Sequence, residues 1–272
     1  MMTQRTAFFI GVALLAAACG GQDDVDQTVA LTGDPVALDR QLLLISGDAR
    51  KGFLLDVAGR QPSAAAKQVE LPYGALRAER RLEHDEALVI CAGRRDSAEA
   101  RAEPSTLAVI ESDGGVRKYV LGATPFDQLV QSKDGRYAVL YRGKAGPGRT
   151  LQNVNELVVV DLDKSPSDDA AVTSKTPEGL AHAFERALVS PELPIAGEMR
   201  RLLVLLSAAE ITLFDLNHLD RRGTIVELGE GEGRMPQPTQ VLFGENEPVL
   251  YVRGENADDV FVFRLEARSG VA

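Results

Sequence analysis

The sequence is poor in the residues that usually form disulfide frameworks, metal sites and aromatic cores. It has no tryptophan, three histidines and two cysteines among 272 residues, and only 5% of the residues are aromatic. Two cysteines allow at most one disulfide, so a disulfide-rich framework is excluded. Long hydrophobic runs are also missing: Ala7–Ala18 is uncharged but only twelve residues long, whereas a membrane-spanning helix needs about 20 apolar residues.

The histidines and clustered acids form no motif of known chemistry. Metal-ligating pairs are usually separated by three to five residues, and no such pair exists among the three histidines, His84, His182 and His218. Four acids crowd one stretch without the glycine and final glutamate of a calcium loop, namely Asp161, Asp163, Asp168 and Asp169. We expect solvated histidines and solvated loop acids, with no metal and no cofactor. A hydrolase triad assembled from distant loops stays open, although the sequence has no G-x-S-x-G motif.

The charge balance is acidic. The formal net charge is −10, and it becomes −11 without residues 1–18, whose one charged side chain is Arg5. Phosphate backbones and anionic lipid surfaces repel such a chain. We therefore expect no nucleic acid partner and no electrostatic adhesion to membranes.

The first residues have the pattern of an export signal. Arg5 precedes the uncharged run Ala7–Ala18, which fits the h-region of a secretory signal peptide. The run ends in AAAC, with the cysteine at position 19. This ending resembles the lipobox of bacterial lipoproteins, although Ala16 stands where that family prefers leucine. The resemblance implies cleavage after residue 18 and attachment of lipid to Cys19. The alternative is an ordinary signal peptide in which Cys19 has no role.

The resemblance also implies a location. Several acyl chains hold a protein on a membrane stably, because each buried CH₂ contributes about 0.8 kcal/mol. The protein would then be anchored in the cell envelope through its lipid. The outer membrane is favoured over the inner, since Gly20 is not the aspartate linked to inner-membrane retention. Residues 19–33 are then the lipidated cysteine and a polar tether, and residues 34–272 form the folded domain. Cys91 ends the apolar run ALVIC and is expected to be a buried, inert thiol.

A pattern of paired apolar runs recurs five times along the domain. Each pair consists of two runs of strand length joined by a polar loop, as in RYAVLYR followed by NELVVVDLD. The first runs are centred at intervals of 45, 50, 65 and 46 residues, near Leu44, Val89, Val139, Val204 and Leu250. Runs this short predict β-hairpins rather than helices. The first runs are nearly continuous in apolar character, so both of their faces should be buried.

A period of 40–50 residues with up to four short strands is typical of a β-propeller blade. The segment SKDGRYAVLYR, which begins at Ser132, resembles the repeats of TolB-like and surface-layer-type propellers. Gly135 in it can adopt the positive φ that a tight turn requires. The absence of tryptophan disfavours the tryptophan–aspartate repeat class. The sequence thus predicts an all-β propeller of about five blade-like units, and the alternative is a β-sandwich or an open sheet.

Completeness of the ring is left open by the sequence. Either five units close it, with residues 28–32 completing the last blade, or the chain forms part of a larger ring. The last unit shows no fourth strand before the sequence LEARSGVA.

Gly143–Thr150 matches the spacing of a phosphate-binding loop, with Arg149 in the lysine position. Such a loop needs a following helix whose amides hold the phosphates. Only Leu151–Glu156 separates it from the next apolar run, and a parallel crossover takes a dozen or more residues. We expect a hairpin loop that binds no nucleotide.

The resulting functional expectation is a non-catalytic binding or scaffolding module of the envelope, with an unidentified protein partner. Two alternatives stay open: an envelope enzyme (a hydrolase or lyase) with its site in the propeller channel, and a piece of a longer propeller protein.

Overall fold

The structure is a computed structural model that describes residues 29–57, 66–95, 101–143, 155–177, 183–208, 210–227, 237–245, 247–255 and 260–266. Over these residues the chain forms strands and turns without a helix, and so without one long and apolar enough to span a membrane. The strands form five antiparallel sheets in sequence order. This arrangement confirms the predicted all-β fold with five propeller-type units.

The first sheet contains β1 (Val36–Ala37), β2 (Gln41–Ser46), β3 (Lys51–Asp56) and β4 (Lys67–Glu70). The second contains β5 (Ala75–Arg80), β6 (Glu86–Cys91), β7 (Ser105–Glu111) and β8 (Val116–Gly122). The third contains β9 (Gln128–Gln131), β10 (Tyr137–Tyr141), β11 (Leu157–Asp161) and β12 (Val172–Lys175). The fourth contains β13 (Arg186–Ile195), β14 (Glu198–Leu206), β15 (Glu210–Asp215) and β16 (Thr224–Glu227). The fifth contains β17 (Pro238–Phe243), β18 (Val249–Gly254) and β19 (Val260–Arg264).

Each sheet is a meander in which every strand pairs with its neighbour in the sequence. The five predicted hairpins are the two central strands of the first four sheets and the last two strands of the fifth. One backbone hydrogen bond repeats in four of the sheets and fixes the same register in each. In three of them the residue after the hairpin's second strand donates its N–H to the carbonyl of the residue before the first strand, namely Val57 to Arg40, Leu162 to Arg136 and Leu265 to Pro248. In the fourth sheet the residue after β15, Leu216, donates to Arg201, which lies within the longer strand β14.

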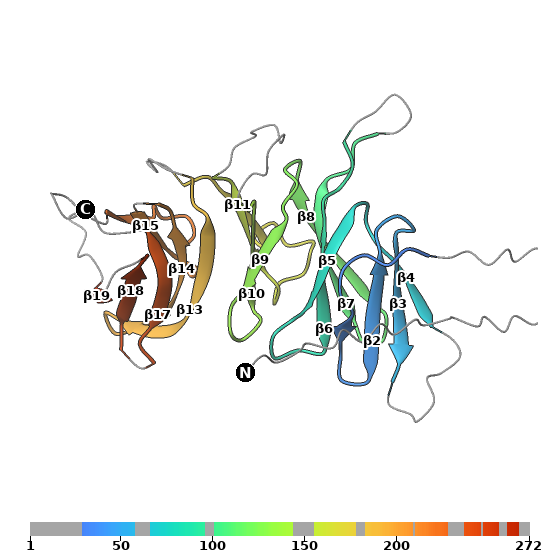
Figure 1. Cartoon of the computed structure of the whole chain (residues 1–272), viewed down its shortest axis with the longest axis horizontal. Coiled ribbons are helices and arrows are strands. Elements are labelled where there is room, and N and C mark those ends of the chain that lie inside the picture. The colour runs from blue at the N-terminus through green and yellow to red at the C-terminus, as the bar shows by residue number, and fades with distance from the viewer. Residues whose placement is uncertain are drawn as a thin grey trace, which may run out of the picture.

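Apolar side chains between consecutive sheets form the core (Figure 1). We call the face that a sheet turns to the preceding sheet its front face, and the opposite face its back face. At each junction, the back face of the preceding sheet contributes a cross-strand pair at the same position of the hairpin. These pairs are Leu43–Leu54, Leu88–Val109, Val139–Val159 and Val204–Leu213. Their partners on the next front face are Ala87–Ile110, Ala138–Val160, Leu203–Phe214 and Leu250–Phe263. The sheets therefore pack in series, which excludes the sandwich alternative.

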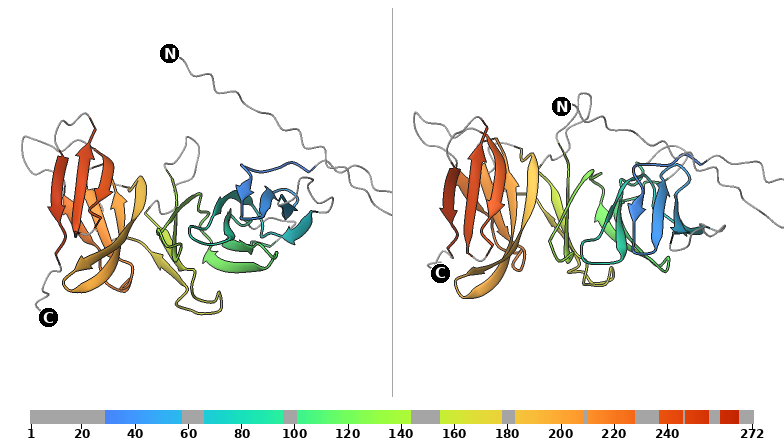
Figure 2. Two further views of the ribbon diagram at one scale, coloured as in Figure 1. Left: turned by 90° about the horizontal axis from the view of Figure 1, so that it is seen from below. Right: turned by 60° about the horizontal axis from the view of Figure 1, so that its bottom comes forward.

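The five sheets follow an arc that does not close into a ring. The first and fifth sheets lie at opposite ends of the long axis (Figure 1), and two further views show the same separation (Figure 2). The expectation that residues 28–32 complete the last blade is wrong for the part of this segment that is described. The N–H of Thr32 donates to the carbonyl of Ile45, so this segment belongs to the first sheet.

Candidate functional site

Several residues singled out from the sequence lie outside the described part of the chain, among them Cys19 and His182. Gly143 is the only described residue of the segment Gly143–Thr150. The strands on either side of this segment pair antiparallel, with Tyr141 opposite Leu157. The segment therefore connects a hairpin, as predicted, and no parallel crossover follows it. The absence of nucleotide binding stays a prediction.

The expectation of solvated loop acids is wrong for Asp161 but right for Asp163, which is exposed in the turn after β11. Asp161 is the last residue of β11, is 7% exposed, and pairs with Arg136 at 3.0 Å. Asp163 pairs with Arg81 at 3.0 Å. The acids are held because the bond from Leu162 to Arg136 places the end of the hairpin against arginines at the junction.

The described histidines and Cys91 show no arrangement that would bind a metal or act as a nucleophile. His218 contacts Asp215 through Nδ1 at 3.1 Å, and His84 lies in the turn before β6. Within the described ranges, no three His, Cys, Asp or Glu side chains gather as a metal site would require. Cys91 is buried, and burial raises the pKa of its thiol to about 12, while Lys118 lowers it. The burial of Cys91 confirms the expected core position, and the inertness of the thiol stays a prediction.

A network of charges crosses the junction between the second and third sheets. Arg81 is 3% exposed and donates from Nε to the carbonyl of Gly135 at 2.7 Å. Its guanidinium also contacts Glu86 at 2.7 Å and Asp163 at 3.0 Å. Arg117 approaches the other oxygen of Glu86 at 2.7 Å. The network joins both sheets through fully paired charges, so its role is to fix their relative position.

Electrostatics within this network follow from its geometry. Burial alone would raise the pKa of Glu86, but hydrogen bonds and charges from Arg81 and Arg117 outweigh burial and lower the pKa. Glu86 is therefore a stable anion at neutral pH rather than a proton donor.

The SKDGR motif serves the next junction. The Ser132 hydroxyl donates to Asp134 at 2.6 Å and accepts the N–H of Tyr137 at 2.8 Å. The other oxygen of Asp134 pairs at 2.9 Å with Arg201 of the fourth sheet. Burial alone would raise the pKa of Asp134, but these partners and the N–H of Arg136 lower it. The motif thus positions an acid that ties two sheets together.

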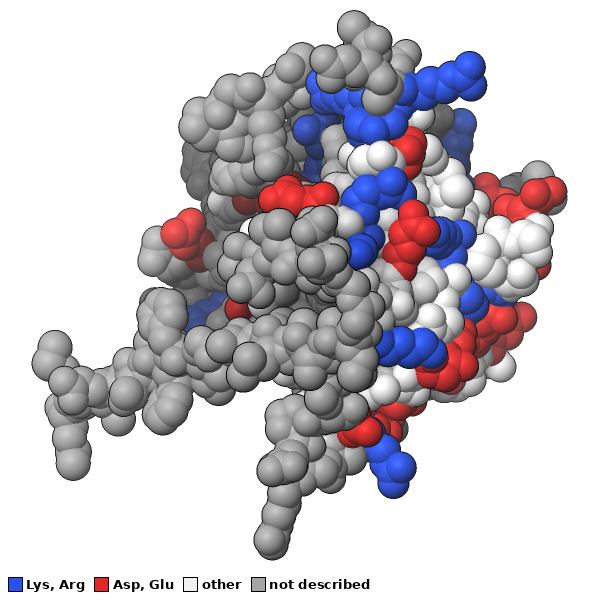
Figure 3. All heavy atoms as spheres, turned by 90° about the vertical axis from the view of Figure 1, so that its right-hand side faces the viewer, with Lys and Arg blue, Asp and Glu red and all other residues white. Residues whose placement is uncertain are grey.

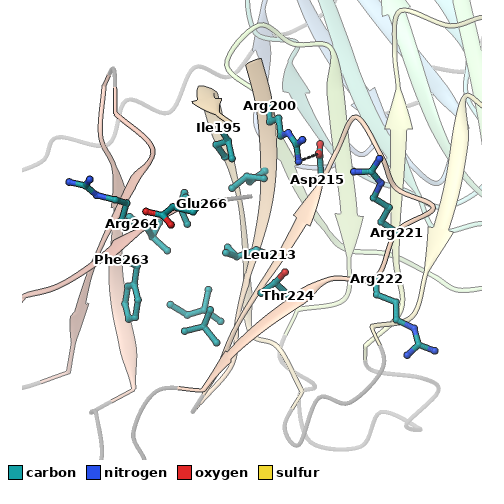
Figure 4. A pocket seen from close by; sticks show the side chains of 15 residues that line it. Ile195, Arg200, Leu213, Asp215, Arg221, Arg222, Thr224, Phe263, Arg264 and Glu266 are labelled. Carbon is teal, nitrogen blue, oxygen red and sulfur yellow. Dashed lines mark ion pairs between the residues drawn. The ribbon is translucent and has the colours of Figure 1, made fainter. Parts of the chain in front are cut away.

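The strongest candidate for a ligand site is a cavity at the junction of the fourth and fifth sheets (Figure 4). Its volume is about 300 Å³, at the lower end of the ~300–1,000 Å³ range of small-molecule sites. The inner wall is aliphatic and aromatic, formed by Ile195, Leu202, Ile211, Leu213, Val226, Leu250, Phe263 and Leu265. The polar lining residues are Arg200, Asp215, Arg221, Arg222, Thr224, Arg264 and Glu266.

Incomplete packing of this junction explains the cavity. Its apolar cluster includes six partly buried members, whereas the other three clusters have two, two and three. In the described residues the fifth sheet has three strands, so β16 has no fourth strand opposite it. The apolar side chain of Val226 on β16 consequently lines an open space, and Leu213 on β15 lines the same space beside Phe263.

The rim of the cavity carries an excess of positive charge. Four arginines and two acids line it, in a chain whose net charge is −10. Figure 4 places Arg200, Arg221 and Arg222 on the side of the fourth sheet, and Arg264 and Glu266 on the side of the fifth. Arg200 pairs with Glu198 at 2.9 Å and with Asp215 at 3.5 Å, and its Nε is buried without a hydrogen-bond partner among the described residues.

Little in the sequence indicates this site. Leu202 and Leu250 belong to runs that were predicted as buried strands, and they are buried. The surrounding arginines come from three separate segments, which only the fold brings together.

Comparisons with known proteins give structural likeness only. No family model matches the chain, and no curated protein matches its sequence. Apo AztD from Citrobacter koseri is similar in structure with 12% identity, a TM-score of 0.41, and coverage of 75% of this chain and 48% of that one. Virginiamycin B lyase from Staphylococcus aureus, solved as an inactive variant with quinupristin, has 13% identity, a TM-score of 0.41 and coverage of 88% and 71%. The Swd1 β-propeller domain from Myceliophthora thermophila has 11% identity, a TM-score of 0.41 and coverage of 83% and 67%. The chain spans about half the length of AztD.

Proposed function

We propose that this protein is an exported lipoprotein, anchored through Cys19, whose propeller-type domain is a non-catalytic binding module. The observation that carries the binding role is the apolar cavity between the fourth and fifth sheets, with its arginine-rich rim. Support for the anchor comes from the sequence MMTQRTAFFIGVALLAAAC alone.

The chemistry of the cavity favours an amphipathic anion. Its interior side chains cannot hydrogen-bond, so they favour a hydrocarbon or ring system over a polar group. The rim places Arg200 and Arg221 near the opening, where a carboxylate or sulfonate can stay partly hydrated while it pairs with guanidinium groups. A ligand with one apolar body and one anionic head satisfies both parts.

Binding is tested with anilinonaphthalene sulfonate, which combines an apolar ring system with one anionic group. The full chain in mild detergent should bind the dye saturably, and dodecanoate should displace it. Leu213→Trp should abolish binding by filling the cavity, because Leu213 lines it and is only partly buried. Unchanged melting temperature in Leu213→Trp shows that the fold is intact.

The charge of the rim is tested separately. Arg221→Glu should weaken dye binding about tenfold, a change of roughly 1.4 kcal/mol, and added salt should reduce the difference. Lys133→Glu is the matched control, since Lys133 is exposed in a turn of the third sheet and makes the same charge change. A dye affinity that neither Leu213→Trp nor Arg221→Glu changes would contradict the assignment of the cavity as the binding site.

Anchoring is tested by labelling with palmitate. The wild-type chain should label and partition with membranes, and Cys19→Ser should do neither. A Cys19→Ser variant that stays membrane-bound, beside a wild type without lipid, would contradict the anchor but not the cavity.

A further inference from the structure

The fifth sheet ends the arc with an apolar back face that no part of the described chain covers. Four large side chains on this face are exposed: Leu242 is 69% exposed, Tyr251 38%, Val260 53% and Val262 61%. Leu242, Tyr251 and Val262 lie directly opposite one another across three strands. Neighbouring strands lie only about 4.8 Å apart, so these three side chains form one continuous surface.

The register of the repeat identifies what kind of surface this is. Tyr251–Val262 is the cross-strand pair of the fifth sheet that corresponds to the four back-face pairs of the earlier sheets. Those pairs each pack against the front face of the next sheet, and Val139, for example, is 0% exposed. The back face of the fifth sheet therefore has the apolar composition of a face that packs against another sheet, but no described sheet follows it.

The first sheet has an apolar front face, but no described sheet precedes it. Its pair Leu42–Leu55 corresponds to the front-face pairs that pack against a preceding sheet elsewhere in the chain. Leu44 and Phe53 continue the same face at the next position of this register. Leu42, Phe53 and Leu55 stay partly exposed and Leu44 is 6% exposed, yet none of the four side chains belongs to an apolar cluster of the core. Figure 3 looks onto this end of the arc and shows uncharged surface between acidic and basic side chains.

We infer that the back face of the fifth sheet docks onto the front face of the first sheet of a second copy of this chain. All four internal junctions join a back face to a front face, and the two ends of the arc present one of each. Closure within one chain is disfavoured, because the two faces lie at opposite ends of the long axis (Figure 1). Paired charges such as Arg81–Asp163 and Arg201–Asp134 also fix the angle at internal junctions.

This contact is heterologous, since it uses different surfaces of the two copies. Head-to-tail contacts close into a ring when the rotations add up to a full turn, and otherwise extend into a filament. The assembly therefore completes the propeller from more than one chain, independently of any ligand in the cavity.

Complementary blocking variants test the inference. Val262→Asp places a charge on the back face, and Leu55→Asp places one on the front face. The full chain, purified in mild detergent, should have a mass of two or more copies by light scattering, and each variant alone should have the mass of one copy. An equimolar mixture should form two-copy complexes and nothing larger, because it contains one intact face of each kind. Val120→Asp is the matched control, since Val120 is 58% exposed on β8, away from both end faces.

Crosslinking gives a second readout that does not depend on blocked assembly. A Val262→Cys chain mixed with a Phe53→Cys chain should be joined by a short bismaleimide, and neither should be joined to itself. The wild-type chain treated in the same way reports any crosslink through Cys19. A wild type of single-copy mass at all concentrations would overturn the inference. An assembly that Val262→Asp breaks and Leu55→Asp leaves intact would overturn it in favour of a back-to-back dimer.

Discussion

Replacing Val139 with aspartate tests whether the back face of the third sheet's central strand is packed against the fourth sheet. Val139 is 0% exposed and lies in β10, between Val130 and Val159 of the adjoining strands. Its side chain faces the fourth sheet in the third apolar cluster. The substitution removes a buried valine, worth about 1.5–3 kcal/mol, and introduces an unpaired carboxylate that costs several kcal/mol more. Their sum is comparable to the whole stability of a typical domain, ~5–15 kcal/mol.

Val139→Asp should therefore fail to accumulate as folded protein at neutral pH. Val139→Ala should fold and lose about 2 kcal/mol, because it removes two buried methyl groups and leaves a small cavity. Val120→Asp should change stability by about 0.5 kcal/mol or less, as exposed substitutions usually do. Far-UV circular dichroism is the suitable assay, since the chain has no tryptophan to report unfolding.

The pH dependence of Val139→Asp sharpens the test. Burial raises the pKa of an introduced carboxyl in the folded state. The destabilisation relative to wild type should then be largest at high pH and should diminish as the pH falls toward the unfolded-state value near 4. A variant that melts within two degrees of wild type at pH 7 would refute the packing of this junction.

The remaining predictions concern the charged junction, the turn glycine and the core thiol. Arg81→Met should destabilise the fold by about 1–3 kcal/mol, because it removes one of the two arginine partners of Glu86 and the hydrogen bond to the carbonyl of Gly135. Since the folded-state pKa of Glu86 is lowered from 4.5, the wild type should lose stability as the pH falls below about 4.5, and Arg81→Met should lose less; equal acid titrations of melting temperature would contradict this. Gly135→Ala should destabilise more than Gly197→Ala: both have positive φ, but only at Gly135 would a Cβ collide with a carbonyl, that of Leu82. Cys91, with a pKa of about 12, should resist iodoacetamide at pH 8 until denaturant unfolds the chain, and rapid labelling of the folded protein would contradict its burial.

The hairpins were predictable because their signal is local. Runs such as Leu157–Asp161 are short, apolar and bounded by polar turns, and period and length distinguish such runs from helices. The turn at Gly135 was predictable for the same reason, and its φ of 69° confirms the prediction. The ion pairs between sheets were not predictable, because Arg81 and Asp163 are 82 residues apart and meet only after two sheets have packed.

The cavity depends on the packing between two sheets, which a local sequence pattern does not indicate. Leu213 and Val226 look like ordinary strand residues, and their partial exposure depends on whether a strand of the next sheet lies opposite them. The apolar residues of the cavity wall could be predicted from the sequence, but the cavity that they line could not. The arginines of the rim carried no motif, because a binding rim needs charge in the right place rather than a fixed spacing.

Burial of the end strands shows where the sequence prediction and the fold diverge. The near-continuous apolar runs predicted strands buried on both faces, and β10 fits, with all five of its residues buried. The same prediction is wrong for β18, whose Tyr251 is 38% exposed. A strand with one solvated face ordinarily alternates apolar and polar residues, yet the back-face positions of the fifth sheet carry tyrosine, leucine and valine. The run thus has the composition of a strand between two neighbouring sheets, while the described chain provides one.

That mismatch between composition and surroundings is expected if a second copy covers the back face of the fifth sheet. Val262→Asp should then improve the solubility of the single chain as it abolishes assembly. A Val262→Asp chain that aggregates more than wild type would show that the face packs within its own chain instead.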